Sequence, residues 1–327
     1  MKITTRGHLQ GWLDGLAKRF TLIAPTTVEE QILYRPLGDS SAIAWDFAKT
    51  DLSAKEYFIP STQVLFSLAK EGKGVRLEEP PLEGERILFG LRPCDARALR
   101  VLDALFLNKE PVDPYYAQRR EKTILIGLAC REMGEECFCT SLGLSPDEAS
   151  DVDLMLTETE EGYAVEAVSR RGREILGDLS LKEVEGTPPK PFVREGRISP
   201  LGAEAWPQHF TRAYWARLSD RCLSCRLCTY VCPTCRCFDV RDEGSWEEGI
   251  ERLSAWDSCM AEGYRRIAGG YNPRPTKMER LRNRFYCKFC YYPQDFGPVA
   301  CVGCGRCIAK CPVNVDVVEV LQEMATW

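Results

Sequence analysis

The sequence lacks the features that mark several common classes of protein. No apolar run approaches the roughly 20 residues that a bilayer-spanning helix needs, and no apolar signal core follows Met1. The 43 basic and 48 acidic residues give a formal net charge of only −5, so there is no general attraction to nucleic acid or to anionic lipid. We therefore expect a soluble, cytoplasmic protein that binds neither nucleic acid nor a membrane.

Histidine is scarce, and a dinucleotide motif is missing. The chain has two His, and nothing near His209 in the sequence suggests catalysis, so we interpret this residue as structural. No G-x-G-x-x-G follows any run that we predict to be a strand. The sequence therefore indicates no dinucleotide site of its own and no catalytic residue.

Cysteine, in contrast, is abundant. The chain has 17 Cys among 327 residues, which is below the roughly 8–10% that marks a disulfide scaffold. An odd number of Cys without a signal peptide favours metal binding over disulfides. Thirteen of the 17 follow residue 220, so the cysteines also divide the chain.

Residues 1–205 are predicted to form an α/β domain. Three apolar runs have the form of buried strands: 20–24, 87–91 and 123–128. Residues 95–106 show helical periodicity with Asp95 as the N-cap, which makes a strand, helix, strand unit. A hairpin is expected within 153–168.

The rest of the chain is predicted to form a second domain, residues 206–327, after a linker rich in Pro and Gly at 185–207. This domain is expected to be mostly α. Residues 247–267 and 276–285 lack strand alternation, and 315–324 places apolar residues on one helical face.

Two cysteine runs share the spacing C-x2-C-x2-C-x3-C-P, which is typical of [4Fe–4S] clusters. In two-cluster ferredoxins the first three thiolates of a run bind one cluster, and the fourth reaches the other. The expected ligand sets are Cys222, Cys225, Cys228 with Cys311, and Cys301, Cys304, Cys307 with Cys232. A pair of zinc sites is the alternative, although zinc usually takes two-plus-two spacing with a longer gap. The pattern therefore predicts two clusters.

The two runs are 68 residues apart, where a compact bacterial ferredoxin would have a short hairpin. We expect the residues between the two runs to form a helical insert. The predicted fold class is thus an α/β N-terminal domain followed by a mostly α, helical dicluster ferredoxin domain, in which helices carry the two cluster loops.

Six segments carry a resemblance to a known family: 90–95, 137–139, 232–240, 256–259, 268–272 and 301–307. Over about residues 85–327, the chain resembles the iron–sulfur subunit shared by cytoplasmic sulfhydrogenase-type [NiFe] hydrogenases (beta subunit) and anaerobic sulfite reductases (A subunit). The resemblance implies an electron-transfer subunit that sits between a flavin subunit handling NAD(P)H and a catalytic subunit, of hydrogenase type or sulfite/sulfur reductase type.

A self-contained reductase is the alternative function. In that case the α/β domain would bind flavin or substrate and the clusters would feed electrons to it. The missing phosphate-binding glycine loop argues against this alternative.

Four cysteines of the first domain form a second group. Cys94 and Cys130 follow the predicted strands 87–91 and 123–128, at the carboxyl ends where α/β folds place ligands. Cys137 and Cys139 lie in a loop that can fold over them. We favour a third [4Fe–4S] cluster here, with buried thiols, a redox pair or zinc as alternatives.

The remaining cysteines are Cys235, Cys237, Cys259, Cys287 and Cys290. One interpretation is a fourth cluster or another metal held by Cys235 or Cys237, Cys259 and Cys287; the other is simple burial of free thiols. The family usually has His-Lys where this chain has Cys287-Lys288, a conservative departure because His and Cys both bind metals. Cys290 has no clear partner.

Residues 265–288 are strongly basic, with eight Lys or Arg and a single acid, Glu279. A solvated helix face accounts for such a run. Alternatively, these charges offset the negative charge of thiolate-bound clusters or form a docking patch for an acidic partner.

Overall fold

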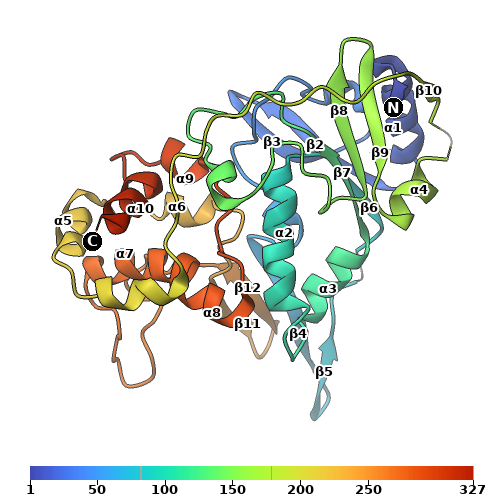
Figure 1. The fold of residues 1–327 in the computed structure, drawn as a ribbon. Coiled ribbons are helices and arrows are strands. Elements are labelled where there is room, and N and C mark those ends of the chain that lie inside the picture. The colour runs from blue at the N-terminus through green and yellow to red at the C-terminus, as the bar shows by residue number, and fades with distance from the viewer. Residues whose placement is uncertain (82, 178, 327) are drawn as a thin grey trace.

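A computed structural model describes residues 1–81, 83–177 and 179–326. Figure 1 shows two bodies, a large sheet with flanking helices and a group of short helices, with helix α2 (Pro93–Phe106) between them. None of the helices in the described residues is long and apolar enough to cross a membrane.

The larger sheet has eight strands and a parallel centre. In spatial order the strands are β10 (Lys182–Glu183), β1 (Lys2–Thr4), β9 (Gly162–Ala167), β8 (Leu154–Thr159), β7 (Thr123–Leu128), β6 (Arg86–Leu91), β2 (Thr21–Val28) and β3 (Gln31–Leu37). Strands β2, β6, β7 and β8 run parallel, while β8 and β9 form the predicted hairpin. The α/β N-terminal region is therefore confirmed.

Helices cover both faces of this sheet. Helix α1 (Arg6–Ala17) and helix α4 (Arg170–Ile175) pack on one face, and α2 and α3 (Pro114–Glu121) pack on the other. Alternate strand residues supply the two cores, so Ile87 and Phe89 face α1 while Leu88 faces α2. Gly90, at φ +75°, forms a bulge in β6 that turns Leu91 toward α2 as well.

Helix α2 also packs against the second body. Its residues Leu99 and Leu102 face the sheet, whereas Ala98 contacts Val302 and Val101 contacts Ala300. The helix starts at Pro93, with Arg92 as the N-cap residue, so the prediction of Asp95 as N-cap is wrong. Proline at the first helical position already fixes the helical φ and lacks the N–H that a cap would satisfy.

The second body is built from short helices around the cysteine loops. These are α5 (Tyr214–Arg221), α6 (Leu227–Tyr230), α7 (Lys277–Tyr286), α8 (Tyr292–Phe296), α9 (Arg306–Ala309) and α10 (Val317–Ala325), with a π-helical turn at Cys287–Tyr291. The helices predicted at 276–285 and 315–324 correspond to α7 and α10. Helix α7 begins with a capping box in which Thr276 and Glu279 bond each other's backbone N–H groups.

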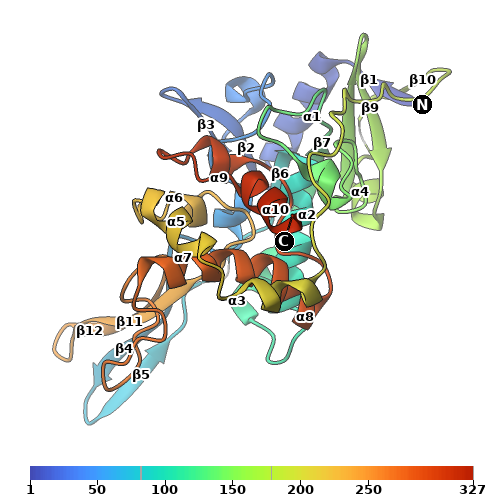
Figure 2. The same cartoon turned by 60° about the vertical axis from the view of Figure 1, so that its left-hand side comes forward.

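The insert between the two cysteine runs is not helical throughout, which corrects the prediction of a helical insert. Strands β11 (Phe238–Ser245) and β12 (Gly249–Trp256) form a hairpin, and β12 pairs with β4 (Thr62–Glu71), which pairs in turn with β5 (Gly74–Glu78). In β12 only Leu253 and Ala255 are buried, so its alternation is too short to be seen in the sequence. Figure 2 shows this sheet extending away from both bodies.

The predicted linker is shorter than the sequence suggests. Residues 185–202 are mostly exposed and irregular, but the turn Ala203–His209 packs into the second body. Trp206 is fully buried and stacks on Phe289 with ring centroids 5.5 Å apart. His209 is 2% exposed, and its carbonyl oxygen accepts a hydrogen bond from the Trp215 indole, in agreement with a structural role.

A buried ion pair joins the two bodies. The Arg306 guanidinium donates two hydrogen bonds of 2.7 Å to the Asp95 carboxylate and two more to Thr50. Both charged side chains are at most 2% exposed. Removing one partner of such a pair leaves an uncompensated charge away from water.

We therefore predict that Asp95→Asn destabilises the protein by roughly 3–5 kcal/mol, as expected for breaking a buried pair. Asp242→Asn is the matched control, because Asp242 pairs with Arg252 through two hydrogen bonds in an exposed position. That change should cost about 1 kcal/mol or less. The measurement is the urea midpoint of cluster-loaded protein under anaerobic conditions. Similar shifts for the two variants would contradict the prediction.

Candidate iron–sulfur centres

The first ferredoxin set surrounds one cavity. Four cysteines line it: Cys222, Cys225, Cys228 and Cys311. The cavity bounds about 440 Å³ of atom-free space. Ser224 and Arg226 have positive φ values, which coil the loop between α5 and α6 around the cavity. Backbone N–H groups of Ser224 and Val315 donate to the sulfur atoms of Cys222 and Cys311, as they do to cluster ligands. The residues present therefore fit a [4Fe–4S] cluster.

The second set lies directly beside the first. Burial raises the pKa of Cys301 to about 12 and that of Cys304 to about 11, and in both cases the thiolates of Cys307 and Cys232 add to the effect. Cys232, from the first run, thus lies among the thiols of the second run. Lys288 Nζ bonds both Cys232 Sγ and the carbonyl of Ala300, which precedes Cys301, and this placement agrees with the exchange of the fourth cysteine that the spacing predicts.

Two buried cations accompany these cysteines. The Lys288 Nζ donates to Cys232 Sγ at 3.2 Å, to Thr234 Oγ1 at 2.9 Å and to the Ala300 carbonyl at 3.1 Å. Burial alone would lower the pKa of Lys288, but the neighbouring thiolates, Cys232 first, outweigh it and raise the pKa well above its usual value.

Arg284 lies between the two sets. It lines the first cavity, and although burial opposes its charge, the thiolates of Cys228 and Cys307 raise its pKa. The basic run 265–288 therefore contains both surface and buried charges. Arg265 and Arg266 are exposed, whereas Arg284 and Lys288 are 4% exposed. The sequence signals that could have singled out the buried pair are their i, i+4 spacing and the adjacency of Lys288 to Cys287.

The four first-domain cysteines line a second cavity. Cys94, Cys130, Cys137 and Cys139 surround about 440 Å³ of atom-free space, together with Cys304 of the second run. Cys94 opens α2 directly after β6, and Cys130 follows β7, so both lie at the carboxyl edge of the parallel strands. Burial raises the pKa of the Cys94 and Cys130 thiols and that of Cys139 to about 12.

The remaining predicted ligands form a third group beside the hairpin β11–β12. Cys237 accepts a hydrogen bond from the Cys259 thiol, which lowers the pKa of Cys237 to about 6. Cys259 also interacts electrostatically with Cys235 and Cys287. The Cys235 backbone N–H donates to the Cys232 carbonyl at 3.4 Å, so this group adjoins the second ferredoxin set. Cys290 is 2% exposed and packs in the hydrophobic core of the second body.

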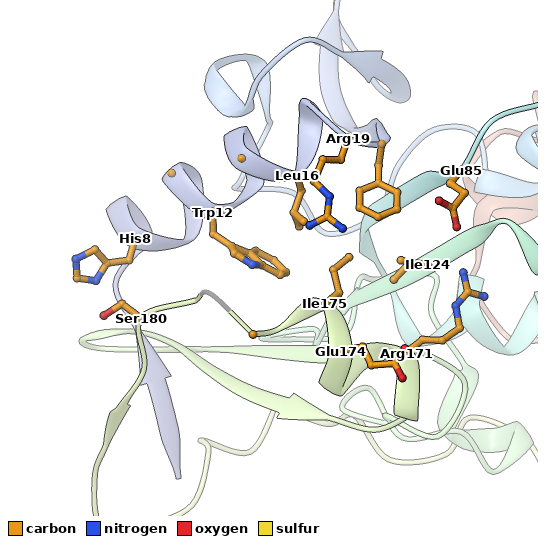
Figure 3. Close-up of a pocket in the computed structure, with 14 residues that line it drawn as sticks. His8, Trp12, Leu16, Arg19, Glu85, Ile124, Arg171, Glu174, Ile175 and Ser180 are labelled. Atoms are coloured by element: carbon orange, nitrogen blue, oxygen red, sulfur yellow. The ribbon is translucent and has the colours of Figure 1, made fainter.

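A large groove lies away from all of these cysteines. Figure 3 shows it between α1 and α4, lined by Trp12, Arg19 and Arg171 among other residues. It bounds about 1470 Å³, part of which is open to solvent. Glu85 and Ile124 place it at the amino ends of β6 and β7, whereas α/β folds bind ligands at the carboxyl ends.

Single-ion geometry is a separate matter from cluster geometry. In residues 1–81, 83–177 and 179–326, no group of three or more His, Cys, Asp or Glu converges as one metal ion requires. A cubane takes its thiolates around a larger inorganic core. The features that bear on cluster binding are therefore the cysteines that line each cavity, the space that they enclose and the charges around it.

Comparison with known proteins first defines the class. Residues 221–315 match the family model described as a 4Fe-4S dicluster domain. The cavity lined by Cys222, Cys225, Cys228 and Cys311 agrees with this match. The chain is therefore an iron–sulfur protein with two [4Fe–4S] clusters.

The chain is also 35% identical over 298 residues to "Sulfhydrogenase 2 subunit beta" of Pyrococcus furiosus, a match that covers 86% of this chain and 85% of that protein. It therefore belongs to the sulfhydrogenase beta subunit family and is an iron–sulfur electron-transfer subunit of that type, which confirms the family that the motifs predict. No solved structure matches the chain.

We predict that Lys288→Met lowers the reduction potential of one cluster by about 100 mV. Removing a buried unit charge several ångströms away takes about 2 kcal/mol from the reduced, more negative state, and 2.3 kcal/mol corresponds to about 100 mV. Lys288→Arg keeps the charge and should leave the potential nearly unchanged. Potentiometric titration followed by electron paramagnetic resonance measures both variants. An unaltered potential in a fully loaded Met variant would refute the role of this charge.

Proposed function

We propose that this chain relays single electrons between a flavin subunit that handles NAD(P)H and a catalytic redox subunit, of hydrogenase type or sulfite/sulfur reductase type. The observation that carries the proposal is the contiguity of the two ferredoxin sets, since helix α6, which carries Cys228, packs against helix α9, which carries Cys307. The name of the relative, a beta subunit, supports a role within a larger complex.

The proposed ligands are those of the spacing pattern. One cluster would be held by Cys222, Cys225, Cys228 and Cys311, and the other by Cys232, Cys301, Cys304 and Cys307. Such clusters supply one-electron transfer with little change of geometry. The chain's own contribution is to hold the thiolates, exclude water and place Arg284 and Lys288 beside them.

The exposure of one ferredoxin set supports electron exchange with a partner at that set. Cys225 is exposed, and Leu223 and Leu227 beside it are 64% and 40% exposed. Cys232 and Cys304 of the other set are at most 8% exposed. Exposed apolar residues at the rim of a redox centre are typical of a protein contact. We propose the surface of Leu223, Cys225 and Leu227 as the docking site of one partner subunit.

The self-contained reductase remains the second candidate, and the groove of Figure 3 is the observation in its favour. Arg19 and Arg171 in that groove could face an anionic ligand. The groove lies at the amino ends of the strands, however, and on the other side of the sheet from α2 and the cysteines. This separation favours the relay.

Cys225→Ser in the assembled complex tests the relay. Loss of a ligand from the exposed cluster should lower coupled electron flow between the partners by at least about tenfold, the scale of losses at metal sites. Each partner should keep its half-reaction with an artificial dye. Cys290→Ala is the matched control, because it removes a buried thiol that belongs to neither ferredoxin set, nor to the first-domain cysteines, nor to the group beside the hairpin β11–β12.

Two outcomes would contradict the relay. If coupled and dye-linked activities fall together while the complex stays assembled by native mass spectrometry, this chain supplies catalytic groups itself. If coupled flow is unchanged although the cluster is absent from the spectrum, the Cys225 cluster lies off the electron path. Co-purification without any flavin or catalytic subunit would instead favour the self-contained reductase.

A further inference from the structure

We propose that the first-domain cavity binds a further [4Fe–4S] cluster through Cys94, Cys130, Cys137 and Cys139. This site lies outside residues 221–315, where the dicluster match falls. The proposal goes beyond the relay and does not rest on it, because the test counts metal and needs no partner subunit.

The fold brings the four thiols to one place from three segments. Cys94 and Cys130 are fixed by neighbouring parallel strands, β6 and β7. The loop after β7 then folds back over them. Its course is held by backbone hydrogen bonds: Cys130 N–H to Pro146 O at 2.9 Å, Cys137 N–H to Gly134 O at 3.1 Å, and Leu144 N–H to Cys139 O at 3.1 Å.

The dicluster domain provides a measure of the space that a cluster needs in this chain. The cavity lined by Cys222, Cys225, Cys228 and Cys311 and the first-domain cavity each bound about 440 Å³. Each is lined by four cysteines of its own group and by at least one buried arginine. The first-domain cavity therefore matches the first ferredoxin cavity in extent, in number of thiols and in having a buried cation in its lining.

The charges around the cavity also favour a cluster. Arg92 lines it and is 5% exposed, yet among the described residues it forms no ion pair with a carboxylate, and its Nε has no hydrogen-bond partner. Lys49 lines it too, with its Nζ 3.0 Å from Glu136 Oε2 and 3.3 Å from the Cys304 carbonyl. Within the described chain, the Arg92 guanidinium otherwise donates only to the backbone carbonyls of Leu128, Ala129 and Phe47. A cubane with four thiolates is negatively charged, so the buried Arg92 and the half-buried Lys49 would compensate it.

The proposed site shares a wall with the second ferredoxin set. The Cys137 Sγ lies 3.7 Å from the Cys304 carbonyl, and Phe138 N–H donates to Gly303 O at 2.9 Å. Gly303 has φ +64°, and a Cβ there would lie 2.5 Å from the Cys139 backbone. The two cysteine loops are therefore in backbone contact, and the further cluster would lie next to the one bound by Cys232, Cys301, Cys304 and Cys307.

Iron and acid-labile sulfide are counted in the full chain, purified and reconstituted anaerobically with Fe²⁺ and sulfide. Because each cubane holds four irons, we expect about 12 irons per wild-type chain, or more if the Cys259 group also binds a cluster. Cys137→Ser combined with Cys139→Ser should remove about four irons and four sulfides. Cys290→Ala is the matched control and should remove none.

The outcomes decide between this site and its alternatives. A folded double variant with the wild-type iron content overturns the proposal, as does replacement of iron by one equivalent of zinc at this site.

If the double variant does not fold, the iron content of the wild type decides: about eight irons or fewer overturns the proposal. About 12 irons that fall to eight in Cys259→Ser would place the extra cluster in the other group and also overturn it. Retention of 12 in that variant supports it. None of these results depends on coupled electron flow, so the relay is judged separately by Cys225→Ser.

Discussion

The contact between the loop 301–307 and the first domain fixes the positions of the cysteines on both sides. Gly303 and Gly305 bring this loop so close to residues 136–139 that a Cβ at either glycine would overlap backbone atoms. Arg306, next to Gly305, enters the first domain and pairs with Asp95. Because Asp95 adjoins Cys94 and Arg306 adjoins Cys307, a single buried ion pair sets the distance between a first-domain cysteine and a ferredoxin cysteine. The two bodies are therefore packed against each other through this loop and this ion pair.

Burial of so many thiolates determines where the cations lie. Arg92, Arg284 and Lys288 are each at most 5% exposed, and the described residues offer them no carboxylate partner within ion-pair distance. An unpaired buried cation is costly unless a negative group replaces the lost water. Clusters at the ferredoxin sets would provide that negative charge beside Arg284 and Lys288, and the proposed first-domain cluster would provide it beside Arg92. Stability and cluster loading are consequently linked, since a chain without clusters would keep these cations buried against neutral thiols.

The sequence predicts the parts of this structure that depend on local spacing. Cysteine intervals predict the exchange of Cys232 and Cys311, and apolar runs predict β6 and β7 with Cys94 and Cys130 after them. Strand β12 was missed because its partner, β4, lies some 180 positions away and only two of its residues are buried. The roles of Asp95 and Arg306 were missed for the same reason: a bond across 211 positions leaves no periodic signal.

The cysteine groups differ in their exposure to solvent, and this difference constrains the route of an electron. The set with Cys225 reaches the surface, whereas Cys232 and Cys304 are enclosed by protein. The enclosed set contacts each other group. Helix α9, which carries Cys307, packs against helix α6, which carries Cys228. Cys235 N–H donates to the Cys232 carbonyl, and Cys137 Sγ lies beside the Cys304 carbonyl. A cluster held by the enclosed set would therefore neighbour each of the other groups. Lys288, bonded to Cys232, places a buried positive charge at that junction, so the charge that stabilises the buried thiolates would also favour the reduced state of a cluster held there.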